Sequence, residues 1–293
     1  MQKLLIIGCG DVARRALPAL TARYEVAALS RQPTRLPAGV RAITADLDHP
    51  QSHDWRAFPA DCILHSAPPG ESGAIDARTR ALLAGLSAAA ALPERLVYIS
   101  TSGVYGDCGG DRVDESRPVN PKSDRGRRRV DAERVLLVWG AEHGVNVSVL
   151  RVPGIYAADR LPVERLRRGT PALRDEDDVF TNHIHADDLA AICVAALERA
   201  GAGAIYNASD DSELKMAAYF DLVAERTGLP PPPRISRAEA GVRINPALLS
   251  FMSESRRLSN AKMKKELGVV LRYPTVFDGV PELRASAANG KST

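Results

Sequence analysis

Residues 3–13, KLLIIGCGDVA, decide the fold. The apolar run 4–7 ends at a glycine, as a buried parallel strand would, and apolar residues then recur at helical spacing over 11–23. The same alternation continues to residue 150, with predicted strands at 3–7, 25–29, 40–44, 61–65, 95–100 and 146–150 and predicted helices at 11–23, 77–91 and 128–143. Such alternation predicts βαβ units in a parallel sheet with right-handed crossovers.

In the second half of the chain this alternation loosens. Helical patterns there cover residues 161–168, 186–199, 214–227 and 260–267, with one more strand at 204–207. We predict an α/β fold with a doubly wound parallel-sheet Rossmann lobe (residues 1–155 and 180–209) and a smaller, mostly helical substrate lobe (residues 156–179 and 210–283). Residues 284–293 are expected to form a flexible tail. The cleft between the lobes is the expected substrate site.

The composition is that of an ordinary globular protein. Hydrophobic residues make up 45% and charged residues 26% of the 293 positions, which excludes disorder over most of the length. The net charge of +3 is too small to indicate nucleic acid as the main partner. No apolar window of about 18 residues predicts a membrane span, and the run 4–7 is too short for the core of a signal peptide. The scattered cysteines have no metal-ligand spacing, so we expect reduced thiols in a cytoplasmic protein without a metal site; they are Cys9, Cys62, Cys108 and Cys193.

The turn after the first strand follows the G-x-G-x-x-A pattern of a dinucleotide site. Gly8 permits a tight bend, Gly10 lets a pyrophosphate approach the backbone, and the alanine three residues later allows close helix–strand packing. The N–H groups at the start of the helix, from Asp11 and Val12 onward, would bind the phosphates. The alternative is a tight strand-to-helix turn without a ligand.

The end of the second predicted strand bears on the choice of cofactor. An NAD-specific site usually has a carboxylate here for the ribose 2′-hydroxyl. The sequence has Ser30-Arg31 instead, with Arg35 nearby. A guanidinium suits a 2′-phosphate, so we predict NADP rather than NAD, although Arg31 as a solvated loop cation is the alternative. Ser66 and Ala67, after the fourth predicted strand, are further candidate cofactor contacts.

Several motifs spread over about residues 3 to 280 resemble one known family. They are ISTSGVYG at 99–106, DE at 114–115 with prolines at 118 and 121, RVPGIY at 151–156, IHADDLA at 184–190, SNAK at 259–262 and ELG at 266–268. Together they are similar to the extended short-chain dehydrogenases/reductases, the NAD-dependent epimerases and dehydratases of sugar nucleotides. The resemblance implies that Asp46 and Leu47 flank the adenine. It also implies a possible homodimer formed through the helices at 77–91 and 128–143.

The chain departs from that family where the chemistry is done. The family's Tyr-x-x-x-Lys pair is replaced by Arg125 and Arg129, a register that Gly126 and the following Ala132-Glu133 support. A guanidinium does not deprotonate in proteins, so Arg125 is no general base, but it could hold a carboxylate or phosphate. Arg129 could still hydrogen-bond the nicotinamide ribose, as the family's lysine does. For Arg127 and Arg128 a solvated helix start is the expected role.

A replacement for the tyrosine must then come from elsewhere. Thr101 matches the family's Ser/Thr, which polarises a substrate hydroxyl or carbonyl. Tyr105 and His65 are the first candidates for the acid/base group, because both are expected near the carboxyl edge of the sheet. Each is more often structural than catalytic.

Two functions remain open from the sequence. The first is an NAD(P)-binding epimerase/dehydratase-like oxidoreductase with an atypical active site. It would act on a small molecule, either a nucleotide sugar or another hydroxyl or carbonyl compound. The second is a non-catalytic NADP-binding sensor or regulatory protein of the same fold, which the loss of both catalytic positions favours.

Overall fold

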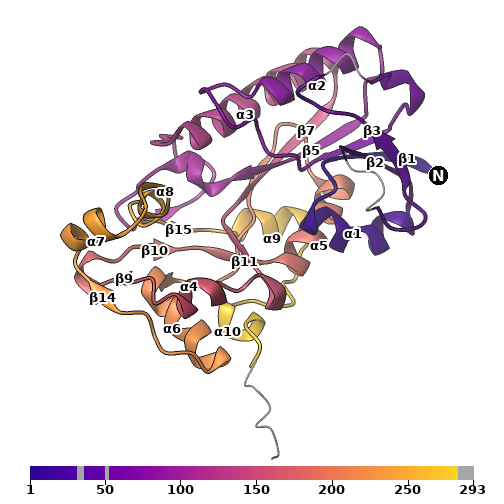
Figure 1. Ribbon diagram of the computed structural model, residues 1–293. Helices are drawn as coiled ribbons and strands as arrows, with labels where there is room; N and C mark the ends of the chain where they lie inside the picture. Colours follow the sequence, from indigo (N-terminus) through magenta and orange to yellow (C-terminus); the bar gives the residue numbers. More distant parts are fainter. Residues whose placement is uncertain (32–35, 50–52, 283–293) are drawn as a thin grey trace, which may run out of the picture.

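The computed structural model describes residues 1–31, 36–49 and 53–282, and a seven-stranded sheet lies at its centre (Figure 1). The strand order is β12-β7-β5-β4-β1-β2-β3. The bounds are Gln2–Ile7 for β1, Tyr24–Ser30 for β2, Arg41–Thr44 for β3, Cys62–His65 for β4, Arg95–Thr101 for β5, Asn146–Val152 for β7 and Ile205–Asn207 for β12. All neighbours pair in parallel, so the carboxyl ends share one edge and the order reverses between β1 and β4. The predicted doubly wound sheet is confirmed, whereas Arg35 and the predicted tail lie outside the described residues.

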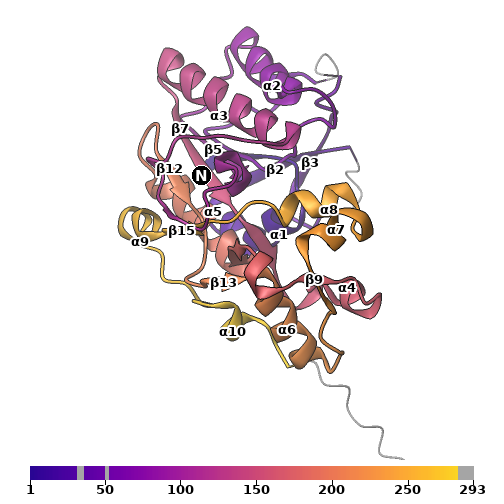
Figure 2. The same cartoon turned by 90° about the vertical axis from the view of Figure 1, so that its left-hand side faces the viewer.

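Helices cover both faces of the sheet, as Figure 2 shows. One face carries α2 (Ala77–Ala88) and α3 (Asp124–His143), and the other carries α1 (Asp11–Thr21), α5 (Ala186–Arg199) and α9 (Ala261–Leu267). Within β1, Leu4 and Ile6 pack toward α1 and α5, while Leu5 and Ile7 pack toward α2 and α3. Burial on both faces explains the continuous apolar run in the sequence.

Helix α3 begins four residues earlier than the pattern of apolar residues predicts. Its N-cap is Ser123, whose hydroxyl accepts a hydrogen bond from the N–H of Gly126 at 3.1 Å. The extra turn is polar, with the sequence Asp-Arg-Gly-Arg, so apolar periodicity could not reveal it. Arg125 therefore lies in the first turn of α3, next to the loop that follows β5.

The substrate lobe contains short helices and pairs of very short strands. The helices are α4 (Val163–Arg167), α6 (Met216–Thr227), α7 (Arg237–Arg243), α8 (Pro246–Phe251) and α10 (Val276–Gly279). Paired strands of two or three residues were not expected, because so few residues show no alternation; they are β6 (Arg112–Val113) with β15 (Arg257–Leu258), β8 (Gly154–Tyr156) with β11 (His183–His185), β9 (Ala172–Leu173) with β14 (Arg234–Ile235), and β10 (Phe180–Thr181) with β13 (Leu214–Lys215). Helix α9, expected in this lobe, instead packs into the core beside α5 through Met263 and Leu267.

Candidate functional site

The glycine turn joins β1 to α1 at the carboxyl edge of the sheet. Gly8 has a φ of +88°, and a Cβ there would lie 2.7 Å from the backbone N and Cα of Ala67. Gly10 is the N-cap of α1, and the space around its missing Cβ is open. Among the described residues no side chain caps this helix, so its first N–H groups can bind a ligand. A dinucleotide pyrophosphate fits this cradle, with the backbone of Asp11 and Val12 beneath it.

Residues at the end of β4 form the wall of that cradle. The backbone N–H groups of Ser66 and Ala67 donate to the carbonyl of Ile7 at 2.9 and 2.8 Å, and the Ser66 hydroxyl donates to the carbonyl of Gly8. These bonds fix the turn against β4. Both residues are predicted cofactor contacts, and both lie at the rim of the cradle.

A network of ion pairs beside the cradle was not expected from the sequence. Arg15 of α1 contacts Asp11 at 3.1 Å, Asp159 at 2.7 Å and Asp187 at 2.8 Å. Arg160 reaches Asp11 at 2.8 Å. Because Asp159 and Arg160 belong to the segment after β8, the network ties α1 to the substrate lobe. Asp11 and Arg15 are four residues apart, but their partners Asp159, Arg160 and Asp187 lie more than a hundred positions away, so no local motif signals the whole network.

The predicted adenine end of the site lies after β2 and β3. Leu47 is buried, and the Asp46 carboxylate accepts a hydrogen bond from the N–H of Asp48 at 3.0 Å. Ser30 is partly buried at the end of β2, and Arg31 is exposed beyond it. The carboxylate of Asp48 has a lowered pKa because Arg78 bonds it at 2.6 Å and Arg31 adds a weaker attraction. Arg31 is therefore close to an existing ion pair, the one between Arg78 and Asp48.

The predicted reaction end of the site begins at Thr101, the last residue of β5. Its hydroxyl accepts a hydrogen bond from the N–H of Gly103 at 3.2 Å, and the side chain is partly exposed. The first turn of α3 lies directly against this loop. A Cβ on Gly126 would lie 3.2 Å from the Gly103 carbonyl oxygen. Thr101 and Arg125 therefore belong to one small region.

The two arginines of α3 differ in their contacts. Arg129 is held inside, because its Nη1 donates to the Tyr98 hydroxyl at 2.9 Å and to the Ile99 carbonyl at 2.7 Å. Arg125 is exposed, and its guanidinium lies over the ring of Phe251 with a centroid distance of 4.7 Å. Partial desolvation by the surrounding protein atoms and, less strongly, the charge of the neighbouring Arg129 lower the pKa of Arg125, although its side chain is accessible to solvent. The guanidinium still carries its charge at neutral pH, so it cannot serve as a proton acceptor.

The placement of Tyr105 and His65 does not support the acid/base role expected for them. Both are 1% exposed. The Tyr105 hydroxyl donates to Asn207 at 2.8 Å, and burial raises its pKa. The His65 Nε2 is 2.9 Å from the Thr79 hydroxyl, and burial lowers the His65 pKa to about 3. The carboxyl edge does contain both residues, but their side chains point into the protein, which strand position alone could not reveal.

One expectation about a charged residue needs correction, and one ion pair was not expected. Arg128 is not a solvated helix-start residue, because it is buried and donates to the carbonyl of Gly73 at 2.6 Å. Sequence reasoning also missed an ion pair beneath the reaction end, in which Arg151 of β7 contacts Glu133 of α3 at 2.8 Å. Glu133 accepts a second bond from the Ser100 hydroxyl. The only sequence signal for this pair was that Arg151 and Glu133 each interrupt a stretch of apolar residues.

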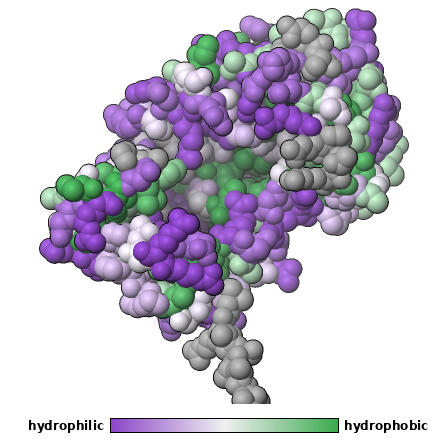
Figure 3. Space-filling model, viewed as in Figure 1, coloured by the Kyte–Doolittle hydropathy of each residue, from purple (hydrophilic) through white to green (hydrophobic). Residues whose placement is uncertain are grey.

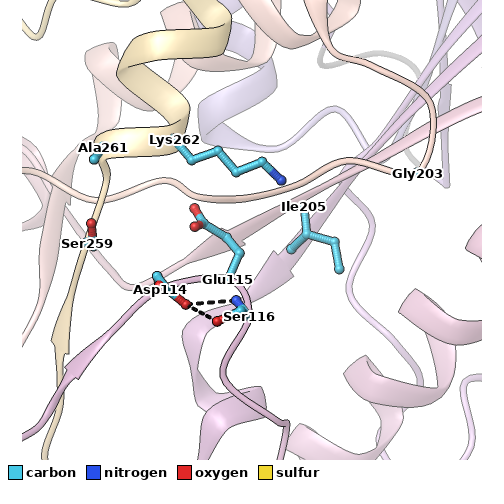
Figure 4. A pocket seen from close by; sticks show the side chains of 8 residues that line it. All are labelled: Asp114, Glu115, Ser116, Gly203, Ile205, Ser259, Ala261 and Lys262. Atoms are coloured by element: carbon cyan, nitrogen blue, oxygen red, sulfur yellow. Dashed lines mark hydrogen bonds between the residues drawn. The ribbon is translucent and has the colours of Figure 1, made fainter.

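Two recesses are visible on the molecule. Figure 3 shows a hollow between the two lobes, with hydrophobic residues on its floor and hydrophilic residues around its rim. A separate pocket of about 540 Å³ lies at the β12 edge, where Glu115 and Lys262 extend into it from opposite sides (Figure 4). The glycine turn and Thr101 do not line that pocket. Within the described residues no group of His, Cys, Asp and Glu could hold a metal, and no helix could cross a membrane.

Curated relatives match different shares of the chain. A 3-diazoavenalumate denitrifying reductase from a Streptomyces species is 27% identical, and the match covers 95% of this chain and 99% of that protein. An uncharacterised protein, y4nG of Sinorhizobium fredii, is 28% identical over 182 residues. The chain spans only 43% of the length of y4nG.

Solved structures share the fold over nearly the whole chain. A conserved protein of unknown function from Silicibacter pomeroyi is 31% identical with a TM-score of 0.79, covering 95% of this chain and 96% of that one. MoeE5, solved with UDP-glucose and NAD, is 23% identical with a TM-score of 0.74, covering 94% and 95%. The model of the NAD dependent epimerase/dehydratase family matches residues 4–209. With the doubly wound sheet and the glycine turn that fits a dinucleotide, this match shows that the chain belongs to the NAD dependent epimerase/dehydratase family.

Proposed function

We propose that this chain is an NAD(P)H-dependent reductase of a small substrate that binds in the hollow between the lobes. The observation that carries the proposal is that none of the acid/base groups expected beside Thr101 is suited to that role. The positions that the resemblance assigns to the tyrosine and lysine hold Arg125 and Arg129, and Tyr105 and His65 are buried. Epimerisation of a hydroxyl needs a base that first removes its proton. Reduction of an electrophilic substrate does not.

The residues around Thr101 suit such a reduction. When bound, a reduced nicotinamide supplies a hydride, which is one hydrogen with two electrons, and leaves oxidised. The Thr101 hydroxyl would donate to the substrate oxygen and orient it. Arg129 would hold the cofactor ribose from the side of α3. Any proton that completes the product would come from water, because the guanidiniums cannot release one.

Two further points support a reductase. The curated relative that matches along nearly its whole length is named as a reductase. The fixed positive charge of Arg125 near Thr101 would also stabilise negative charge that develops on a substrate as it accepts a hydride. A nucleotide sugar remains the second substrate class, since MoeE5 was solved with UDP-glucose.

For the cofactor we propose NADP. Arg31 stands after β2, and neither position 30 nor position 31 is a carboxylate. A 2′-phosphate would gain a charge-assisted hydrogen bond from the guanidinium. NAD has no 2′-phosphate and would neither gain nor lose a contact with Arg31, so the proposed preference for NADP rests on this single cation.

The proposal is tested by following the absorbance of the reduced nicotinamide with a panel of carbonyl and other electrophilic compounds. Nucleotide sugars are assayed separately for interconversion. We expect oxidation of the reduced cofactor with at least one acceptor and no interconversion of nucleotide sugars. Interconversion of any nucleotide sugar by the wild type would overturn the reductase proposal. Cofactor binding with no turnover of any compound would favour the second candidate, a non-catalytic NADP-binding protein, which the two arginine replacements also support.

We also propose that the chain forms a homodimer through α2 and α3. Arg80 of α2 and Arg134 of α3 both contact Asp131, at 2.6 and 3.2 Å, so the two helices present one continuous surface. Val138 on that surface is 51% exposed. Light scattering of the wild type and of Val138→Asp tests the proposal, and a wild-type monomer would overturn it.

A further inference from the structure

The strongest unassigned feature is the charge at the first turns of α3. Arg125, Arg128 and Arg129 have no ion pair with a carboxylate among the described residues. Arg128 and Arg129 donate to neutral oxygen atoms. By contrast, Arg127 in the same turn pairs with Asp124 at 2.6 Å. Positive charge on one side of the helix is therefore left without a counter-ion.

Acidic residues of the substrate lobe do not neutralise this charge. Glu254 is the acid that acts on Arg125, but its carboxylate bonds Arg256 at 2.9 Å. Arg256 in turn donates to the Gly106 carbonyl at 2.7 Å, which fixes the pair beside the loop after β5. An anion that approaches the first turns of α3 would thus meet a net positive field.

The contact between Arg125 and Phe251 leaves the guanidinium ready to bind. The Arg125 guanidinium lies over the ring of Phe251, with its Cζ 4.7 Å from the ring centroid. A cation–π contact holds the cation at the ring and supplies no oxygen acceptor for its N–H groups. No acceptor for those N–H groups is found in the described residues. Arg125 is exposed and Phe251 is 49% exposed, so the pair lies at the surface of the protein.

From these contacts we propose that Arg125 is the anchor for a substrate carboxylate and selects small carboxylic acids as hydride acceptors. The planar fork of a guanidinium matches the two oxygens of a carboxylate. Thr101 begins the loop after β5, and Gly126, the neighbour of Arg125, packs against Gly103 of that loop. A small acid held by Arg125 would therefore have its reacting carbon directed toward Thr101. This proposal rests on the proposed reductase function and names the substrate class of that same site.

The experiment measures binding, so it does not depend on turnover. The holoprotein, loaded with oxidised NADP, is titrated by calorimetry with cinnamate, benzoate and butyrate, and with cinnamamide, benzamide and butyramide. We expect at least one carboxylate to bind while its amide does not. In Arg125→Ala the affinity for that carboxylate should fall roughly ten- to a hundredfold, the loss typical of a charge-assisted hydrogen bond. Arg125→Lys should recover part of it.

Arg127→Ala is the matched control, because Arg127 lies two residues away, is exposed and already has an acid partner. Its carboxylate affinity should equal that of the wild type. Equal binding of acids and amides, no binding of any carboxylate, or an equal loss in Arg127→Ala would overturn the proposal. The reductase function fails separately, if no acceptor oxidises the reduced cofactor while carboxylates still bind through Arg125.

Discussion

The glycine turn and the first turn of α3 lie at the same edge of the sheet but depend on different parts of the chain. The turn requires its glycines, because Gly8 packs against backbone and Gly10 would have to leave room for a phosphate. The first turns of α3 present Arg125 and Arg129, which the resemblance places at the family's tyrosine and lysine positions. Arg125 is exposed, so its exchange costs the fold little. The cofactor cradle is thus fixed by backbone geometry, whereas the chemistry depends on side chains that can change.

The largest effect is expected at the cradle. Gly10→Val should weaken dinucleotide binding more than about a hundredfold, because the side chain would fill the space of the pyrophosphate. The unliganded protein should lose only about 1 kcal/mol, since nothing lies within 4 Å of the new Cβ. Calorimetric titration with NADP and urea unfolding measure the two quantities.

Gly8→Val is the control for this prediction. Its φ of +88° and the backbone of Ala67 at 2.7 Å should cost several kcal/mol of stability. If Gly10→Val bound cofactor at wild-type strength, the cradle would be only a turn, and the two regions would no longer differ.

The second effect concerns stability against pH. His65 is buried, and its pKa in the folded protein is about 3, below the ordinary value of 6.5. Below about pH 6.5 the His65 side chain therefore binds a proton in the unfolded chain but stays neutral in the folded chain. Stability therefore falls as the pH drops from about 6.5 toward 3. At about pH 5 the loss amounts to roughly 2 kcal/mol relative to neutral pH. Urea unfolding over this range should show a smaller loss in His65→Gln, and an unchanged loss would contradict burial as the cause.

The third effect is the cofactor preference. Arg31→Ala should lower the affinity for NADP about tenfold, because one charge-assisted contact is lost, and leave the affinity for NAD unchanged. Titration of both cofactors against both proteins checks this. Equal affinities of the wild type for NADP and NAD would show that Arg31 does not contact the 2′-phosphate.

The smallest effect is expected for Tyr105→Phe. The hydroxyl bonds Asn207 inside the protein, so its loss should cost about 1 kcal/mol of stability and change turnover by less than about twofold. Once an acceptor is known, steady-state kinetics and urea unfolding separate the two. A hundredfold slower reaction in a stable variant would return Tyr105 to the acid/base role and erase the contrast between the two regions.

Sequence patterns predicted the sheet well because its central strands β1, β4, β5 and β7 are buried on both faces. The motif at residues 8–13 could also be interpreted from the sequence, because local backbone conformation requires its glycines. The orientation of Tyr105 and His65 could not be predicted, because it depends on Asn207 and Thr79, which are distant or on another element. The contact between Arg125 and Phe251 joins residues over a hundred positions apart and likewise leaves no local pattern.

The carboxylate of Glu115 has a consequence for how the protein behaves at high concentration. β12 is the edge strand of the sheet, and the outward N–H of Asn207 donates to Glu115 at 2.7 Å. Unpaired N–H groups on an edge strand invite strands of other molecules to add to the sheet. Here the Glu115 carboxylate already accepts a hydrogen bond from the N–H of Asn207, and the strand is only three residues long. Glu115 thus protects the protein against aggregation through this edge.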